Sequence, residues 1–432
     1  MKVSLVNPPW TFEGSIYFGC REPHLPLELG YSAALLTRAG HEAEIIDAPL
    51  QGLGRQDVVR RVEAFGPDMT VVTTAPTYLF WRCAQPELRV PRDMLAALKG
   101  KAGRLVAVGP HGSATPRAAL RKLGADVVVM GECEEIVASL AEGGPLDRVP
   151  SIAWRDAYGR GRVQGAPAAA KFSTLPALLW PEDWVARHRH HHHRFDGNPA
   201  EWGPGAEVEA SRGCPYHCSF CAKENFRDSY RRRDLGELLL EIDTLRGQGA
   251  EYLYFIDEIF LPDRRLLEAL VGRGLKFGVQ TRIDLWKPEM LDLLGHAGCV
   301  SIEAGMESLT AEGRDMLAKD CRMDTNTLTQ RLVHARRRVP FVQANLIAVP
   351  TDDAAHVARW REAMKTLGIW ANDPVPLFPY PGTPDYRRLF GPVDDHAWER
   401  AVQHYLSLFD RFSDIQDERP LPLAQLEGEA AE

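Results

Sequence analysis

The feature that most constrains the fold is an alternation of short apolar runs with helical patterns, which occurs in two blocks. In the first block, residues 1–143, the expected strands cover 3–6, 44–46, 69–74, 105–108 and 127–130. Helical spacing fills the intervals, as from Leu27 to Ala39, where Gly40 ends the pattern. Strands that alternate with helices predict an open parallel α/β sheet with helices on both faces, whose ligands lie beyond the carboxyl ends of the strands.

The second block, residues 206–385, repeats the alternation. Its expected strands are 208–210, 252–256, 277–280, 300–304, 342–349 and 369–375, with helical patterns between them. Six such units predict a partial (β/α)6 barrel with reactive groups at the carboxyl ends of its strands. Residues 144–205 lose the rhythm and predict a linker or strap with a small hairpin at 152–163. Residues 386–432 predict a C-terminal helix, near 395–412, and a frayed Pro- and Glu-rich tail from Gln416.

Composition narrows the class of protein. The 432 residues suit two domains, and 45% hydrophobic with 25% charged residues is typical of a globular chain. A net charge of −8 gives no basic footprint for nucleic acid, and no apolar run is long enough to predict a membrane span. The N-terminus lacks the pattern of a signal peptide, so we expect a cytoplasmic, reducing environment.

Three of the eight cysteines lie within eight residues, directly after the first predicted barrel strand. Cys214, Cys218 and Cys221 have the spacing C-x3-C-x2-C. Three thiolates on one short loop can hold three irons of a [4Fe–4S] cluster and leave the fourth iron open to an external chelator. Zinc is the alternative, with His217 as a fourth ligand.

This cysteine loop resembles that of the radical S-adenosylmethionine (SAM) superfamily, and four further segments support the resemblance. Residues 255–260, 302–308, 345–350 and 378–384 are similar to the superfamily's second-, fourth-, fifth- and sixth-strand segments, although 345–350 lacks the usual Gly before Pro. The resemblance implies that the three cysteines ligate the cluster. It also implies a SAM site, for which we expect the residues Phe220, Asp257, Gln280, Arg282 and Glu307.

The first block resembles the Rossmann-like (flavodoxin-like) cobalamin-binding domain that precedes many such barrels. The matching stretches are residues 7–9, 26–30, 44–47, 109–112 and 131–135. The whole chain is therefore similar to class B, cobalamin-dependent radical SAM enzymes. On this basis the predicted cobalamin-binding residues are Asn7, Pro8, Asp47, Thr74, Pro76, Tyr78, Gly109, His111, Gly131 and Glu132.

The resemblance implies a cobalamin-dependent radical SAM methyltransferase that methylates an unactivated carbon of a small molecule, such as a natural product. An electron from an external donor of the flavodoxin or ferredoxin type would reduce the cluster and cleave SAM to a 5′-deoxyadenosyl radical. That radical would abstract a hydrogen atom, and methylcobalamin would deliver the methyl group. The main alternative keeps the cofactors but transfers no methyl, and ends in oxidation, cyclisation or ring rearrangement.

Two other functions are compatible with parts of the sequence. Methylthiotransferases bind a second cluster on three N-terminal cysteines, and this chain has Cys20, Cys83 and Cys133 there, without that family's local motif. A cobalamin sensor with a degenerate barrel is the non-catalytic alternative. The intact cysteine triad argues against it.

Histidines raise two further questions. No Asp-x-His-x-x-Gly sequence occurs in residues 1–145, and His24, His41 and His111 have no carboxylate in that register. We therefore expect base-off cobalamin without a histidine ligand, its lower face covered by residues 74–78. The run His188–His193 is either a metal or substrate-facing segment or a solvated linker, and composition favours the linker.

Overall fold

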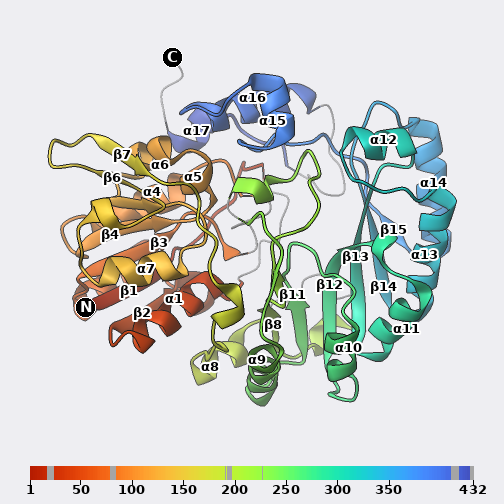
Figure 1. The fold of residues 1–432 in the computed structure, drawn as a ribbon, viewed down its shortest axis with the longest axis horizontal. Helices are drawn as coiled ribbons and strands as arrows, with labels where there is room; N and C mark the ends of the chain where they lie inside the picture. Colours follow the sequence, from red (N-terminus) through yellow and green to blue (C-terminus); the bar gives the residue numbers. More distant parts are fainter. Residues whose placement is uncertain are drawn as a thin grey trace.

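A computed structural model describes residues 1–16, 24–77, 84–189, 191, 197–225, 227–409 and 418–428. Two α/β domains lie side by side, and helices from the C-terminal part of the chain lie across one end of both (Figure 1). No helix of the described residues is long and apolar enough to cross a membrane.

The first domain is built on a seven-stranded sheet with the order β2-β1-β3-β4-β5-β6-β7. The first five strands are parallel, and their order is the flavodoxin-like one, which confirms the predicted α/β class. The hairpin expected in the linker is present, and its strands extend this sheet: β6 pairs antiparallel with β5, and β7 pairs antiparallel with β6. The strand bounds are β1 Lys2–Asn7, β2 Glu42–Asp47, β3 Met69–Thr73, β4 Arg104–Val108, β5 Val127–Val129, β6 Ile152–Arg155 and β7 Gly161–Gln164.

Helices cover both faces of this sheet because successive strand residues point to opposite sides. Leu5 packs on the side of α1 and α7, and its neighbour Val6 packs on the side of α3, α4 and α6. The helix bounds are α1 Leu27–Arg38, α2 Ala48–Gln51, α3 Arg55–Phe65, α4 Arg89–Leu98, α5 Pro110–Ala114, α6 Pro116–Leu123 and α7 Glu134–Ala141, followed in the strap by α8 Glu182–Arg187.

The second domain is a partial barrel of six parallel strands in the order β15-β14-β13-β12-β11-β8. Helices α9 to α14 follow the strands, and Asp234, Asp263, Asp324 and Asp353 cap α9, α10, α13 and α14 by accepting backbone N–H bonds. The bounds are β8 Gly205–Val208, α9 Leu235–Gly247, β11 Tyr252–Phe255, α10 Arg264–Leu270, β12 Lys276–Arg282, α11 Pro288–His296, β13 Cys299–Glu307, α12 Ala311–Met316, α13 Thr325–Arg338, β14 Phe341–Leu346, α14 Ala354–Thr366 and β15 Trp370–Ala371.

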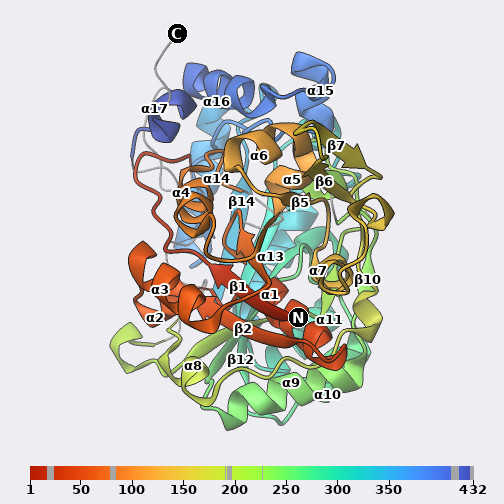
Figure 2. The same cartoon turned by 90° about the vertical axis from the view of Figure 1, so that its left-hand side faces the viewer.

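The end of the chain returns to the first domain. After α15 (Pro384–Phe390) and α16 (Ala397–Leu408), residues 418–428 include the short helix α17 (Leu423–Glu427), which lies beside α4 and α16 (Figure 2). The expectation of a frayed tail is therefore wrong for these residues. Leu423 and Leu426 are buried, and this apolar packing outweighs the Pro- and Glu-rich composition.

Candidate functional site

A short two-stranded ribbon carries the cysteine loop. Strand β9 (Ser211–Arg212) pairs antiparallel with β10 (Arg231–Arg232), so the loop begins and ends at one place. Gly213 has a φ of +77°, and a Cβ there would lie 2.1 Å from the carbonyl oxygen of Ser229. Only glycine therefore fits next to Cys214. The Gly213 amide donates to Glu258 Oε2 at 2.7 Å, which attaches the loop to the end of β11.

The three cysteines of this loop are free, half-buried, and line one cavity of about 350 Å³, which we call the barrel cavity. Burial raises the pKa of all three thiols, that of Cys221 to about 12, and the thiols of Cys214 and Cys218 add to the effect on Cys221. Ligation by iron requires the thiolates, so loading of the site must release protons.

The thiols fit a cluster better than a single ion. Among the described residues, no three His, Cys, Asp or Glu side chains converge on one point where an ion would sit. A zinc ion needs four ligands around one centre, whereas a [4Fe–4S] cube takes one thiolate on each of three separate irons. His217, the potential zinc ligand, has a side chain that is 63% exposed.

Four of the five residues predicted for SAM line the barrel cavity with the cysteines: Phe220, Gln280, Arg282 and Glu307. Asp257 does not line it. Its carboxylate accepts bonds from the Ala210 amide at 2.8 Å and from Ser211 Oγ at 2.5 Å, behind the cysteine loop. Its neighbour Glu258 faces the cavity in its place. The strand-end position was predictable, but not which of the two adjacent carboxylates turns inward.

Glu307 has a partner that sequence reasoning missed. Lys319 Nζ lies 2.9 Å from Glu307 Oε1, and the Lys319 side chain is only 2% exposed. Glu307 follows a bulge at the end of β13 and has a φ of +67°, a strained conformation for a residue with a side chain. The cavity thus holds a carboxylate and an ammonium side by side. Lys319 could not be predicted from the sequence, because it lies in the loop after α12 and belongs to no recognisable motif.

Arg282, at the end of β12, contacts the cysteine loop. Its guanidinium lies 3.9 Å from the centre of the Tyr216 ring and donates to Asp284 Oδ2 at 2.8 Å. Because Tyr216 stands between Cys214 and Cys218, this cation–π contact ties β12 to the loop.

A buried network of charges joins the cysteine loop to the first domain. Arg212, fully buried between the rings of Tyr31 and Phe172, donates to Glu134 Oε1 at 2.7 Å and to Glu209 Oε2 at 2.7 Å. Burial would raise the pKa of Glu209, but Arg212 and Arg227 outweigh it and lower the pKa to about 2. The network links the two domains, and removal of one partner would leave a buried charge uncompensated.

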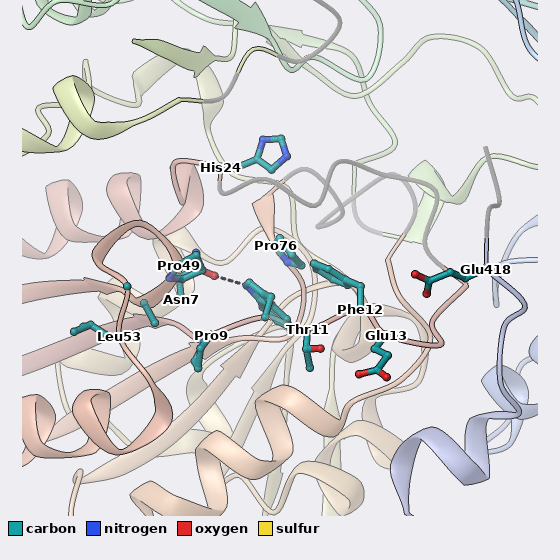
Figure 3. Close-up of a pocket in the computed structure, with 13 residues that line it drawn as sticks. Asn7, Pro9, Thr11, Phe12, Glu13, His24, Pro49, Leu53, Pro76 and Glu418 are labelled. Atoms are coloured by element: carbon teal, nitrogen blue, oxygen red, sulfur yellow. Dashed lines mark hydrogen bonds between the residues drawn. The ribbon is translucent and has the colours of Figure 1, made fainter. Parts of the chain in front are cut away.

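A second cavity of about 450 Å³ lies at the carboxyl ends of β1, β2 and β3, and we call it the strand-end cavity (Figure 3). In a flavodoxin-like sheet this is the expected ligand site. Of the predicted cobalamin residues, Asn7 and Pro76 line it. Behind them, Asn7 Nδ2 donates to Asp47 Oδ1 at 2.9 Å, and Asn7 Oδ1 accepts from Trp10 Nε1 at 2.7 Å. Burial raises the pKa of Asp47 to about 7.

The structure does not bring the other predicted cobalamin residues to the lining of this cavity. Glu132 binds Arg231 with both oxygens at 2.7 Å, and Gly131 lies against the backbone of Ala168. His111 is buried, with Nε2 2.8 Å from the carbonyl of Gln85 and Nδ1 3.1 Å from Thr74 Oγ1, and burial lowers its pKa to about 4. Pro8 and Gly109 are not among the lining residues, and Tyr78 lies outside the described residues.

His24 lines the strand-end cavity, and sequence reasoning missed its partner. Its Nδ1 lies 2.9 Å from Oε1 of Glu207, a buried residue of β8. His188, the first residue of the histidine run, lies on the same carboxylate, with Nε2 3.8 Å from Glu207 Oε2. His24 and Glu207 are more than 180 positions apart in the sequence, so no local motif predicts their contact. At least this end of the histidine run is packed rather than solvated.

Two family models match the chain in order. The B12 binding domain covers residues 20–141, and the radical SAM superfamily covers residues 208–362.

Curated relatives match most of the chain. An uncharacterised methyltransferase of Pyrococcus horikoshii is 24% identical over 94% of this chain and 84% of its own. The hopanoid C-3 methylase of Methylococcus capsulatus is 27% identical over 99% of this chain and 78% of its own. The anaerobic magnesium-protoporphyrin IX monomethyl ester cyclase of Cereibacter sphaeroides is 26% identical over 80% of this chain and 56% of its own.

Among solved structures, the chain resembles TsrM of Kitasatospora setae, a radical SAM methyltransferase described with cobalamin and a [4Fe–4S] cluster bound. The TM-score is 0.69 at 19% identity, over 89% of this chain and 73% of that one. The two chains share this fold.

Proposed function

This chain belongs to the cobalamin-dependent radical SAM enzymes, and we propose that it methylates an unactivated carbon of a small molecule. One observation carries the proposal. Three free cysteines and the Glu307–Lys319 pair line a single cavity in a barrel that follows a B12-binding domain. The methyltransferases among the relatives that match most of this chain favour methyl transfer as the outcome.

Different residues of the barrel cavity would hold the cluster and SAM. Cys214, Cys218 and Cys221 would ligate the cluster. Glu307 and Lys319 offer an acceptor and a donor to the charged groups of SAM. When bound, the cluster and SAM supply a 5′-deoxyadenosyl radical, and methylcobalamin supplies the methyl group. The protein contributes position and exclusion of water: Ile347, Val375 and Leu377 give the cavity an apolar wall.

Product analysis tests the reaction. The protein would be reconstituted with iron, sulfide and cobalamin and incubated with SAM, a reductant and candidate substrates. Methylation predicts 5′-deoxyadenosine and S-adenosylhomocysteine in equal amounts, with a substrate mass gain of one methylene. Loss of 5′-deoxyadenosine formation in a Cys218→Ala variant is the control. A reconstituted protein that forms no 5′-deoxyadenosine with any substrate would refute the proposal.

A non-methylating reaction is the second candidate, and the matched cyclase relative favours it. The same experiment separates the two. Oxidation, cyclisation or ring rearrangement predicts 5′-deoxyadenosine without S-adenosylhomocysteine, and no gain of a methylene by the substrate.

We further propose that cobalamin binds base-off without a histidine on cobalt. The support is that His111 lies on Thr74 and Gln85 rather than on the strand-end cavity. His24 is the histidine that could contradict this, because it lines the cavity and Glu207 orients it. Electron paramagnetic resonance of the cob(II)alamin form tests whether a nitrogen is bound to cobalt. Nitrogen superhyperfine triplets that disappear in His24→Gln would show that His24 is a cobalt ligand, whereas a wild-type spectrum without triplets supports the proposal.

The electron source and the compartment complete the proposal. An external donor of the flavodoxin or ferredoxin type supplies the electron that the cluster needs to cleave SAM. The protein works in the cytoplasm, where reducing conditions keep Cys214, Cys218 and Cys221 available for iron. Reduction of the reconstituted cluster by such a donor in place of dithionite, followed at 400 nm, tests the first point.

A further inference from the structure

Residues 418–428 lie beyond both matched family models, and they form part of the first domain in space. The Leu421 amide donates to the carbonyl of Gly14 at 2.8 Å. Gly14 has a φ of +71°, and a Cβ there would lie 2.7 Å from Leu421 Cδ1, so the Leu421 side chain lies directly against the Gly14 backbone. Leu423 and Leu426 are buried beside this contact. The segment is thus attached to the loop that follows β1.

Glu427 fastens the far end of the segment. Its side chain is 3% exposed, and it accepts from the Leu88 amide at 2.9 Å and from Lys122 Nζ at 2.7 Å. Its carbonyl oxygen accepts from Arg92 at 2.6 Å. Burial would lower the pKa of Lys122, but Glu427 and Glu399 outweigh it and raise the pKa. Charge-assisted bonds of this kind are about twice as strong as neutral ones.

The same segment borders the strand-end cavity. Glu418 is one of the lining residues, together with Phe12 and Glu13 of the loop to which Leu421 is attached. Figure 3 shows Glu418, Phe12 and Glu13 on one side of the cavity, away from Asn7 and Leu53. That side is therefore built by the loop that follows β1 together with Glu418 from the C-terminal segment, whereas the strand ends of the sheet build the other side.

We propose that residues 418–428 form a clasp that retains cobalamin in the strand-end cavity, with Glu427 as its latch. Glu418 and Glu13 accept hydrogen bonds from primary amide side chains at the rim of the corrin, which are N–H donors. The clasp rests on the proposed function, because it assigns the cavity to cobalamin. The proposal also gives the C-terminal residues a role in the strand-end cavity, which belongs to the N-terminal domain.

The dissociation rate of cobalamin tests the clasp without any turnover. Wild type, a chain ending at residue 417, and Glu427→Ala would be loaded with hydroxocobalamin and diluted into excess cobalamin-binding scavenger. We expect dissociation at least about tenfold faster in both variants, the size of one lost charge-assisted hydrogen bond. Hydrogen exchange at the amides of Leu88 and Leu421 should accelerate in Glu427→Ala, and absorption of the cluster near 400 nm should remain.

Two controls separate retention from general loss of stability. Gln425→Ala changes an exposed side chain on the same helix α17 and should leave the rate unchanged. Leu98→Ala removes a buried core side chain and destabilises the same domain, but Leu98 ends α4 at the end of the sheet opposite the cavity, so the rate should again stay near that of wild type.

Three results would overturn the clasp. An unchanged dissociation rate in the truncated chain refutes it and leaves the proposed function intact. Equal acceleration by Leu98→Ala shows that the effect is one of domain stability alone. A wild-type protein that takes up no cobalamin overturns the proposed function, and the clasp with it.

Discussion

The barrel cavity and the strand-end cavity differ in how far apart in the sequence their lining residues are. One loop of ten residues, 214–223, supplies three thiols to the barrel cavity, and residues in or just after neighbouring parallel strands supply most of the rest. The strand-end cavity combines three strand ends with His24 and with Glu418 from the end of the chain. The first contains the paired charges Glu307–Lys319, whereas hydrogen bonds such as Asn7–Asp47 support the second from behind. A reactive site thus concentrates its chemistry in few residues, and a holding site distributes it.

The largest expected effect is the loss of the cluster from the barrel cavity while the strand-end cavity still binds cobalamin. Replacement of Cys214, Cys218 and Cys221 by Ala together should abolish iron–sulfur absorption near 400 nm and all formation of 5′-deoxyadenosine. Cobalamin binding should persist, because the other cavity lies in a separate domain. Absorption spectra of the reconstituted variant check both points, and retained 5′-deoxyadenosine formation would contradict the cluster assignment.

The next prediction concerns the junction between the cavities. Arg212→Ala leaves the buried carboxylate of Glu134 without its arginine and leaves Glu209 with Arg227 alone, so we expect a loss of about 3–5 kcal/mol in the free energy of unfolding. The matched control is Arg232→Ala. That arginine is 54% exposed and pairs with Asp263 at 2.9 Å, and its loss should cost less than about 1 kcal/mol. Denaturant unfolding measures both, and equal costs would show that the buried network does not hold the domains.

Within the barrel cavity, Glu307→Ala should weaken SAM binding by about 2 kcal/mol, since it removes one partner of a buried charged pair. Absorption of the cluster should remain. Glu312→Ala, an exposed carboxylate of α12, serves as the control. Isothermal titration with SAM is the measurement, and an unchanged affinity would reject a role for Glu307.

The last prediction is a pH dependence in the first domain, whose effect is spread over a range of pH. Burial lowers the pKa of His111 from 6.5 to about 4, so between these values the unfolded chain binds a proton that the folded chain does not. The free energy of unfolding therefore rises with pH across this window, by up to about 1.4 kcal/mol per pH unit from this group. In His111→Gln this component should disappear. Unfolding of the two proteins between pH 4.5 and 6.5 compares the slopes, and identical slopes would contradict the assignment.

Much of the barrel cavity was predictable from sequence because its signals are local. The cysteine spacing, the strand ends at Gln280 and Arg282 and the segment around Glu307 all lie within a few residues of a recognisable strand. The prediction for Asp257 was wrong because two adjacent carboxylates follow the end of β11, and Asp257 binds the backbone of Ala210 whereas Glu258 faces the cavity. Glycine patterns located the loops of the first domain, yet Gly131 lies against Ala168 of the strap and Glu132 binds Arg231 of the second domain.

The sequence by itself determined the α/β class, the order of the two domains and the cysteine triad, because periodicity and spacing depend on neighbours along the chain. Only the tertiary structure decided which distant groups meet: Lys319 beside Glu307, Glu207 beside His24, and Glu427 on Lys122. Burial makes these pairings necessary, because a charge removed from water must find an opposite charge or a hydrogen bond. Which partner it finds depends on how the two domains pack, and no local pattern records that.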